Sequence, residues 1–396
     1  MTPDPPATLQ TRRFLLLYAL ASAGGAVAYV PFLTILLPMR ISGMVGTDDL
    51  TWLAYATLAG AIAASLSNVA FGWASDRSRA RVPWIVTGLL ASCGLLVAFS
   101  AARSVEIVIG LLVAWQCALN MLLAPLAAWA GDCVPDDQKG TLGGLLAFAP
   151  AAGALAGVLV TAPGLAGPDA RLGLVAFLVV LCVAPVLLFG HPRAFPQLMQ
   201  DEGGATKLRV RPGAPVARMW LARLLVQISE AALFAFLYFW LRSIDPAMTD
   251  AMVAQIFGAI LVLAVPLALL VGRWADRRRR PFVPLAFTAA IAAVGLLIMA
   301  AAPGLSIALT GYVVFGLSAA IFLSLHSAQT LRVLPRATHR GRDLGIFNLT
   351  NTAPSVAVPW LTLALVPTFG FTGLFVVLAA CAFGAALLLS RLPRVV

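Results

Sequence analysis

The sequence predicts an all-α membrane protein with twelve transmembrane helices arranged as two pseudo-symmetric six-helix bundles. The 396-residue chain is 61% hydrophobic and only 11% charged, with a mean hydropathy of +0.94. This composition leaves too little polar surface to cover a water-soluble globule of that size. The apolar residues form runs long enough to cross a bilayer. One loop motif also occurs twice, 200 residues apart, which indicates two related halves.

The internal repeat is carried by two pairs of loops. Residues 72–77 read Gly-Trp-Ala-Ser-Asp-Arg, and residues 272–277 read Gly-Arg-Trp-Ala-Asp-Arg. Residues 134–143, with Val-Pro and then Lys-Gly, are matched by residues 334–345, with Leu-Pro and then Arg-Gly. Two repeats in register indicate an internal duplication, and repeated halves in an apolar chain are typical of transporters.

Twelve runs have the length of a spanning helix, which needs roughly 20 mostly apolar residues. Charged residues gather in the short connections between these runs. No connection is long enough to hold a separate enzymatic domain, so we expect the function to lie within the helices. The predicted spans are 14–38, 52–73, 83–102, 106–130, 142–163, 172–190, 216–241, 252–273, 283–302, 304–328, 344–365 and 371–390.

One long polar connection, 191–215, divides the chain into an N-terminal bundle, 1–190, and a C-terminal bundle, 216–396. If the N-terminus is cytoplasmic, 22 of the 27 Lys and Arg residues fall on the cytoplasmic side, as the positive-inside rule requires. We therefore expect a multi-pass protein of the bacterial inner membrane. The linker 191–215 and both termini are expected in the cytoplasm.

The formal charge of +11 would suggest a nucleic-acid partner if the protein were soluble. Here the basic residues lie in short tracts between spanning runs, so they are interpreted as topology signals. The expected partners are the lipid bilayer, protons and a small-molecule substrate, with no nucleic acid, and the chain is expected to be a monomer. The five cysteines are odd in number and lie in or at the ends of apolar runs. Their spacing predicts no disulfide framework, metal site or cofactor.

The repeated loop motif has a physical interpretation. A helix that ends Gly-x-x-x-Asp-Arg can bring its glycine against a neighbouring helix while the carboxylate caps that helix or pairs with an arginine. Such a clasp could hold one conformation and break in another. The alternative is that the charges only set topology, but two copies at matched positions favour the clasp.

At these residues the sequence resembles the major facilitator superfamily, whose signature after the second and eighth helices is Gly-x-x-x-Asp-Arg followed by basic residues. The resemblance extends over the whole chain through the helix count, the repeated halves and the central linker. It implies two bundles that rock about a central cavity in alternating access. It also implies gating-loop roles for Gly72, Asp76, Arg77, Arg81, Gly272, Asp276 and Arg277.

Two shorter resemblances point to different subfamilies. Residues 75–85 resemble the glycoside-pentoside-hexuronide cation symporters and related sucrose carriers. Those symporters carry acidic residues late in the second helix, where this chain has Ala64 and Asn68, so sodium coupling of that type is not implied. Residues 149–153 resemble a degenerate glycine-proline motif of drug/proton antiporters, which have a glycine at the position of Ala149. That second resemblance favours export.

Glu230 is the one carboxylate predicted near mid-membrane, and exposing it to lipid would cost several kcal/mol. The spacing of Arg223, Gln227 and Glu230 places them on one helix face, which Phe234 and Tyr238 continue. Because desolvation favours the neutral form of a carboxyl group, Glu230 is a candidate for reversible protonation, and we predict proton coupling through it. The alternative is a permanent ion pair with Arg223 or with an arginine of another helix.

Other polar residues in the predicted spans are candidates to line a substrate cavity. Helices 1, 4, 7 and 10 line the cavity in the superfamily, so the resemblance favours Tyr29, Asn120, Gln227, Glu230 and His326 among them. For any single amide, a hydrogen bond between helices without a ligand role is the alternative. The full set is Tyr29, Asn68, Gln116, Asn120, Gln227, Phe234, Tyr238, His326, Asn348 and Asn351.

The predicted function is a secondary active transporter for a small organic solute, driven by protons. A sugar-like or other neutral solute is preferred over proton-driven multidrug or metabolite efflux. A non-transporting receptor or assembly factor on the same fold is the second class, but it needs neither intact gating loops nor a mid-membrane acid. An enzyme is disfavoured, because no catalytic triad, metal motif or phosphate-binding loop is present. A primary pump would need a nucleotide-binding domain.

Overall fold

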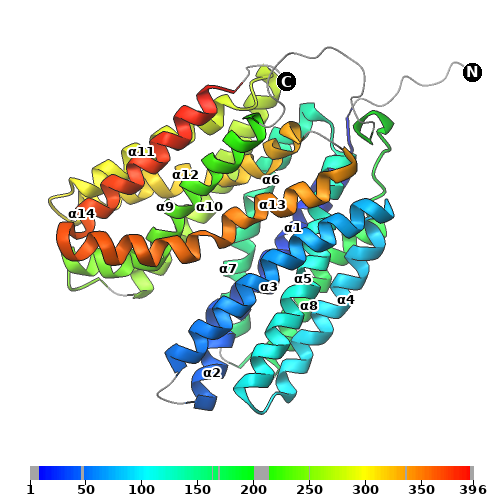
Figure 1. The fold of residues 1–396 in the computed structure, drawn as a ribbon, viewed down its shortest axis with the longest axis horizontal. Helices are drawn as coiled ribbons and strands as arrows, with labels where there is room; N and C mark the ends of the chain where they lie inside the picture. Colours follow the sequence, from blue (N-terminus) through cyan, green and yellow to red (C-terminus); the bar gives the residue numbers. More distant parts are fainter. Residues whose placement is uncertain are drawn as a thin grey trace, which may run out of the picture. The chain divides into compact units, whose positions relative to one another are not determined.

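A computed structural model describes residues 9–45, 49–162, 164–167, 170–199, 214–248, 250–334 and 337–392. These ranges form helices and connecting turns without a β-strand, as the sequence predicts (Figure 1). Eleven described helical segments are long and apolar enough to cross a membrane. The predicted span 344–365 falls instead across the break between α13 (Arg340–Thr352) and α14 (Pro354–Ser390).

The chain forms two compact units, and each takes one short segment from the other half of the sequence. Unit 1 comprises residues 1–135, 148–203 and 336–348, whereas unit 2 comprises 136–147, 204–335 and 349–396. These boundaries differ from the predicted bundles 1–190 and 216–396 in the segments 136–147 and 336–348. Most of the predicted linker 191–215 lies outside the described residues.

Unit 1 is built around α1, which packs against α7 and α8, and around α5, which packs against α3 and α4. The ring of Trp115 lies 4.7 Å from that of Phe32, and Phe32 lies 4.8 Å from Phe99, at the centre of this unit. The helices of this unit are α1 (Arg12–Pro31), α2 (Leu37–Val45), α3 (Asp49–Ser78), α4 (Val82–Ala98), α5 (Val105–Cys133), α7 (Phe148–Thr161) and α8 (Arg171–Phe189), with π-helix η1 (Phe32–Leu36) and 3₁₀ helices η3 (Phe99–Ala101), η5 (Pro196–Met199) and η6 (Ala337–His339).

In unit 2, α11 packs against α12 and α14, α9 packs against α14 and α12, and α6 packs against α10 and α12. A Cβ added to Gly295 of α11 would lie 2.5 Å from the backbone nitrogen of Phe315 in α12, so a small residue allows this close approach. The helices are α6 (Lys139–Leu146), α9 (Ala214–Ile244), α10 (Asp250–Arg278), α11 (Val283–Ala300), α12 (Leu305–Val333) and α14 (Pro354–Ser390), preceded by 3₁₀ helix η4 (Asp136–Gln138).

Prolines break the fifth and eleventh predicted spans at comparable places. A proline inside a helix has no N–H to donate and its ring clashes with the carbonyl four residues earlier. The helix α6 accordingly ends at Leu146, four residues before Pro150, and α13 ends at Thr352, just before Pro354. Within α14 the helix also breaks at Gly370, whose φ of 64° is in the left-handed region that glycine tolerates. Two of the boundaries between the units, at 147/148 and 348/349, fall near the proline breaks.

Candidate gating loops and intramembrane acidic pocket

In unit 1, Asp76 caps the N-terminus of α13. Its Oδ1 accepts a hydrogen bond of 2.9 Å from the backbone N–H of Gly341, and its Oδ2 accepts one of 2.9 Å from that of Arg342. The first backbone N–H groups of a helix have no partner within the helix and carry partial positive charge, so a carboxylate stabilises them. The side chain of Asp76 is only 4% exposed. The predicted clasp thus has a specific acceptor and two specific donors.

Glycines permit this capping contact. A Cβ added to Gly72 would lie within 3.0 Å of the Gly341 carbonyl, and a Cβ on Gly341 would lie equally close to the Gly72 carbonyl. One helical turn further on, a Cβ on Gly345 would lie 2.6 Å from the Cα of Val69. The Gly-x-x-x-Asp spacing therefore places a backbone contact at one position and a carboxylate one turn later.

A charged network extends the cap through unit 1. Arg81 Nη1 lies 2.7 Å from Asp76 Oδ1, and Arg81 Nε lies 2.9 Å from Asp132 Oδ2. Arg340 Nη1 in turn lies 2.6 Å from Asp132 Oδ1. Burial opposes the charged form of Arg81, but the Asp132 and Asp76 carboxylates outweigh it and raise the pKa of Arg81 above its ordinary value. Arg81 therefore stays charged and links the two carboxylates.

Unit 2 contains the corresponding cap. Asp276 Oδ1 accepts a hydrogen bond of 2.8 Å from the backbone N–H of Gly140, and Oδ2 accepts bonds of 2.7 Å and 2.9 Å from the N–H and hydroxyl of Thr141. A Cβ on Gly272 would lie within 3.0 Å of the Gly140 carbonyl. Arg332 Nη2 lies 3.4 Å from Asp276 Oδ1 and also donates to the backbone carbonyl of Asp136. Each unit thus carries one aspartate that caps one helix.

The two caps differ in their supporting charges. At equivalent positions 200 residues apart, unit 1 has Asp132 and unit 2 has Arg332. Asp132 binds two arginines, whereas Arg332 binds the capping carboxylate of Asp276 directly. The predicted gating residues Arg77 and Arg277 have exposed side chains, and their roles stay predictions.

Sequence reasoning did not single out Asp132, Arg332 or Thr141 as members of these networks. Asp132 and Arg332 stand two residues before the repeated Val-Pro and Leu-Pro pairs, and this shared position is the signal that could have identified them.

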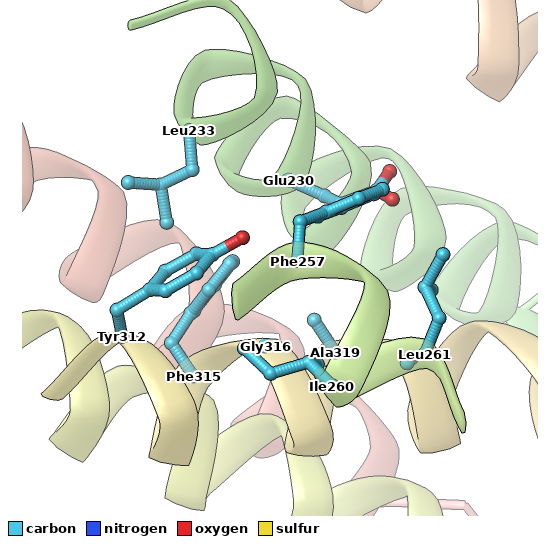
Figure 2. Close-up of a pocket in the computed structure, with 10 residues that line it drawn as sticks. Glu230, Leu233, Phe257, Ile260, Leu261, Tyr312, Phe315, Gly316 and Ala319 are labelled. Carbon is cyan, nitrogen blue, oxygen red and sulfur yellow. The ribbon is translucent and has the colours of Figure 1, made fainter. Parts of the chain in front are cut away.

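A pocket inside unit 2 is lined by residues of α9, α10 and α12 (Figure 2). Glu230 is the only charged residue in its described lining, and the Tyr312 hydroxyl is directed toward α9, which carries Glu230 and Leu233 (Figure 2). Gln227 Nε2 donates a hydrogen bond of 2.9 Å to Glu230 Oε2. The remaining lining is Leu233, Phe257, Ile260, Leu261, Phe315, Gly316, Ala319 and Ala320.

Arg223 lies on the same helix as Glu230 but has other partners. Its Nη1 donates to Ser327 Oγ at 3.0 Å and lies 3.4 Å from His326 Nδ1, and its Nη2 donates to Asn351 Oδ1 at 3.3 Å. No described basic side chain forms an ion pair with Glu230. The structure therefore brings Arg223, His326 and Asn351 together and leaves Glu230 with Gln227.

His326 is fully buried, and its partners define its tautomer. Its Nε2 lies 3.0 Å from the backbone carbonyl of Met219, which can only accept, so Nε2 carries the hydrogen. In the neutral ring Nδ1 is then an acceptor, and it faces Arg223 Nη1 and the Thr330 hydroxyl. His326 thus orients the Arg223 guanidinium group through a lone pair.

Two predicted cavity residues of unit 1, Asn68 and Asn120, form a contact between α3 and α5, and Gln116 joins it only through its backbone carbonyl one turn earlier on α5. Asn68 Nδ2 donates to Asn120 Oδ1 at 2.7 Å, and Asn120 Nδ2 donates to the Gln116 carbonyl at 2.8 Å. All three side chains are buried, whereas Tyr29 is 41% exposed. This geometry fits the alternative of a hydrogen bond between helices, and the substrate roles of these residues stay predictions.

The remaining predicted cavity residues are not brought to the pocket by any described contact. The side chains of Phe234 and Tyr238 lie outside the described residues, although their backbone belongs to α9. Asn348 is half-buried in the part of α13 that belongs to unit 1. No group of three His, Cys, Asp or Glu side chains among the described residues could hold a metal ion.

A duplicated bundle of spanning helices, with matched capping aspartates and an acidic group inside the membrane span, defines a membrane transporter. The sequence profile of the Major Facilitator Superfamily matches residues 14–318 and 219–395. The chain belongs to this superfamily. A search of curated protein sequences found no significant match.

Solved structures of transporters share the fold. The human organic anion transporter MFSD10 aligns with a TM-score of 0.76 and 13% identity, over 96% of this chain and 99% of that one. A bacterial homologue of the iron transporter ferroportin, in an outward-facing state, gives 0.69 and 16%, over 96% and 98%. The E. coli fucose:proton symporter FucP, as an N162A variant, gives 0.72 and 15%, over 95% and 97%. At these identities the similarity shows the fold alone.

Proposed function

We propose that this protein is a secondary active transporter that moves a small organic solute across the bacterial inner membrane by alternating access, coupled to protons through Glu230. It works as a transporter rather than as an enzyme. The observation that carries the proposal is the position of Glu230. This residue belongs to a membrane-spanning helix, and its carboxylate lines a pocket between helices and forms no ion pair with a described residue.

The chemistry of an intramembrane carboxylate supports proton coupling. An ionised acid at the bilayer centre costs about 3 kcal/mol on insertion scales, so such residues are usually functional. Gln227 supplies one hydrogen bond to Glu230 Oε2, and Oε1 has no partner among the described residues. A carboxyl group with one free oxygen can take up a proton when the pocket is closed and release it when water enters.

The capping aspartates support a conformational cycle. Asp76 accepts two short hydrogen bonds from the N-terminus of α13, and Asp276 accepts two from that of α6. In each cap, a single movement of the capped helix would break both hydrogen bonds. Hydrogen bonds to charged groups contribute about 1.5–3 kcal/mol each, so a cap of this kind can hold one state without making it permanent. We propose that the caps form and break during alternating access, with both chain termini in the cytoplasm and the chain acting as a monomer.

The substrate class stays open between the two predicted alternatives. The sequence favours a neutral, sugar-like solute over proton-driven efflux of drugs or metabolites. The pocket beside Glu230 has a cavity volume of about 30 Å³, which is room for about one water molecule and not for either class of solute.

Two steps test the proposed function. A thermal-shift screen of the purified protein against sugars, organic amines and organic acids at pH 6 and pH 8 identifies a solute. Proteoliposomes with an imposed pH gradient then measure accumulation of that solute. We expect accumulation that collapses when the gradient is abolished with an ionophore. Solute that only equilibrates down its own concentration gradient, at a rate independent of the pH gradient, would overturn proton coupling.

A further inference from the structure

The beginning of the linker, residues 191–199, is bound to unit 1 through a buried glutamine just before α1. Gln10 is only 3% exposed, and its Nε2 donates to the backbone carbonyls of Cys133 at 2.9 Å and Arg193 at 3.2 Å. Its Oε1 accepts from the backbone N–H groups of Thr11 at 2.9 Å and Arg193 at 3.1 Å. A single side chain therefore joins the residues before α1, the end of α5 and the linker.

Further contacts keep the linker in this place. The Arg193 guanidinium donates to the Leu9 carbonyl at 2.9 Å, so Arg193 is bound through both its backbone and its side chain. Phe195 is 4% exposed and anchors the segment by burial of an apolar ring. His191 has a φ of 35°, in the left-handed region that is unfavourable for a residue other than glycine. Such a strained turn persists only where the surrounding contacts determine it.

The same segment reaches the first turn of α13. Arg340 begins this helix, and its Nη2 donates to the backbone carbonyl of Leu198 at 3.1 Å, while its Nη1 lies 2.6 Å from Asp132 Oδ1. Asp132 immediately precedes Cys133, whose carbonyl Gln10 binds. The linker thus contacts Arg340 directly, and Gln10 connects it to the peptide group beside Asp132.

Loss of the linker contacts would weaken the ion pair next to the cap. The attraction between two charges falls steeply when water replaces a low-dielectric surrounding. The Arg340 side chain is 9% exposed, and its Nη2 has the Leu198 carbonyl as an acceptor. Without the linker this nitrogen would need water, which would enter beside the ion pair with Asp132. Gly341 follows Arg340 directly, so a looser Arg340 also loosens the first N–H group that Asp76 binds.

We propose that residues 191–199 form a strap that keeps the N-terminus of α13 docked on unit 1, and that Gln10 holds this strap in place. Release of the strap from Gln10 frees Arg340 and favours opening of the Asp76 cap, whereas a bound strap favours the capped state. The linker is then a regulatory element of this cap as well as a connection between the two units. This inference goes beyond the proposed transport and holds whatever solute or ion is moved.

Hydrogen–deuterium exchange of the full-length protein in lipid nanodiscs, followed by mass spectrometry, tests the strap. The N–H groups of Gly341 and Arg342 are bonded to Asp76, so they exchange only when the cap opens. Gln10→Ala removes the hydrogen bonds that hold the strap, and we expect exchange at these two positions to become about threefold to tenfold faster. No ligand is added, so the result is independent of the proposed transport.

Arg40→Gln is the matched control. Arg40 also joins separate segments of unit 1, because its Nη2 donates to the carbonyls of Ser100 and Ala102 at 3.2 Å each. It lies on α2, which follows the opposite end of α1 from Gln10. We expect this variant to leave exchange at the start of α13 unchanged. Equal acceleration in Arg40→Gln, or equal acceleration in the buried middle of α5 in Gln10→Ala, would show general loosening of the unit and overturn the inference.

Two further variants separate the strap from Gln10 itself. Phe195→Ala removes the buried ring of the strap without changing Gln10, and we expect the same acceleration at the start of α13. In an Arg340→Gln background, the added effect of Gln10→Ala is expected to disappear, because the strap acts through Arg340. Unchanged exchange in either folded single variant, or full acceleration by Gln10→Ala in the Arg340→Gln background, would contradict the strap.

Discussion

Asp76 and Gly341 lie 265 positions apart in the sequence, yet the Asp76 carboxylate accepts a 2.9 Å hydrogen bond from the Gly341 backbone N–H. The same carboxylate accepts from Arg342 and pairs with Arg81. A motif at the end of one helix therefore fixes the beginning of a helix from the other half of the chain. This relationship makes the clasp testable residue by residue.

Asp76→Asn keeps the size of the side chain but removes its charge. The substitution replaces one of the two carboxylate oxygens, which accept hydrogen bonds, with an NH₂ group, which cannot accept one. We therefore expect the cap to lose about 2–4 kcal/mol and the transport rate to fall at least tenfold. Solute flux in proteoliposomes measures this effect. Asp245→Asn is the matched control, because that carboxylate accepts from the nearby Ala247 N–H at the end of α9. An equal loss in both variants would contradict the clasp.

Gly72→Ala tests the close approach of backbones. The new Cβ would lie within 3.0 Å of the Gly341 carbonyl, so α3 or α13 must shift, and we expect a lower melting temperature and loss of transport. Gly94→Ala in α4 is the control, since a Cβ there meets nothing within 4 Å. That change is expected to leave stability unchanged or raise it by about 0.5–1 kcal/mol. Normal function in Gly72→Ala would show that the contact is dispensable.

Asp132 and Arg340 are expected to be energetically coupled. Their side chains are each 9% exposed and lie 2.6 Å apart, so removing one leaves the other buried without its partner. We predict that Asp132→Asn and Arg340→Gln each destabilise the protein, and that the double variant loses about 1–3 kcal/mol less than the sum of the two. Reversible unfolding of the four proteins in detergent measures this difference. Strict additivity would mean that the ion pair contributes nothing.

His326 is expected to be neutral with its hydrogen on Nε2 at pH 7. The Met219 carbonyl requires a donor at Nε2, and the Arg223 guanidinium requires an acceptor at Nδ1. Solid-state NMR of ¹⁵N-histidine-labelled protein in bilayers, with His326→Gln used for assignment, distinguishes the three forms. A doubly protonated ring at pH 7 would contradict the assignment, because its Nδ1–H would face the guanidinium.

The sequence predicts the all-helical membrane fold, the repeat and both capping aspartates because each depends on a local pattern. Apolar runs reveal spans, and a motif that recurs at the same offset identifies equivalent loops. The partners of these residues are harder to predict. Nothing in the local pattern around Asp132 indicates that it binds arginines at positions 81 and 340, because that contact depends on how helices pack.

Helix irregularities were likewise only partly predictable. Predicted span 14–38 is interrupted by a π-helix at Phe32–Leu36 after Pro31, and predicted span 344–365 is divided just before Pro354. Proline forbids the regular hydrogen bond but does not determine how the chain adjusts. The spacing of Gln227 and Glu230 predicts that they share a helix face. It does not predict that Phe257 and Phe315 line the pocket beside Glu230, because these residues come from other helices.

The most direct test of the central claim compares wild-type protein, Glu230→Gln and Glu106→Gln in proteoliposomes with an imposed pH gradient. Glu106 is an exposed carboxylate in the first turn of α5, so it controls for loss of a glutamate as such. The solute is the one identified by the thermal-shift screen, and its uptake is followed with and without the gradient. We predict gradient-driven accumulation in wild type and Glu106→Gln, and none in Glu230→Gln. Accumulation by Glu230→Gln at the wild-type rate and with the wild-type dependence on pH would contradict the account.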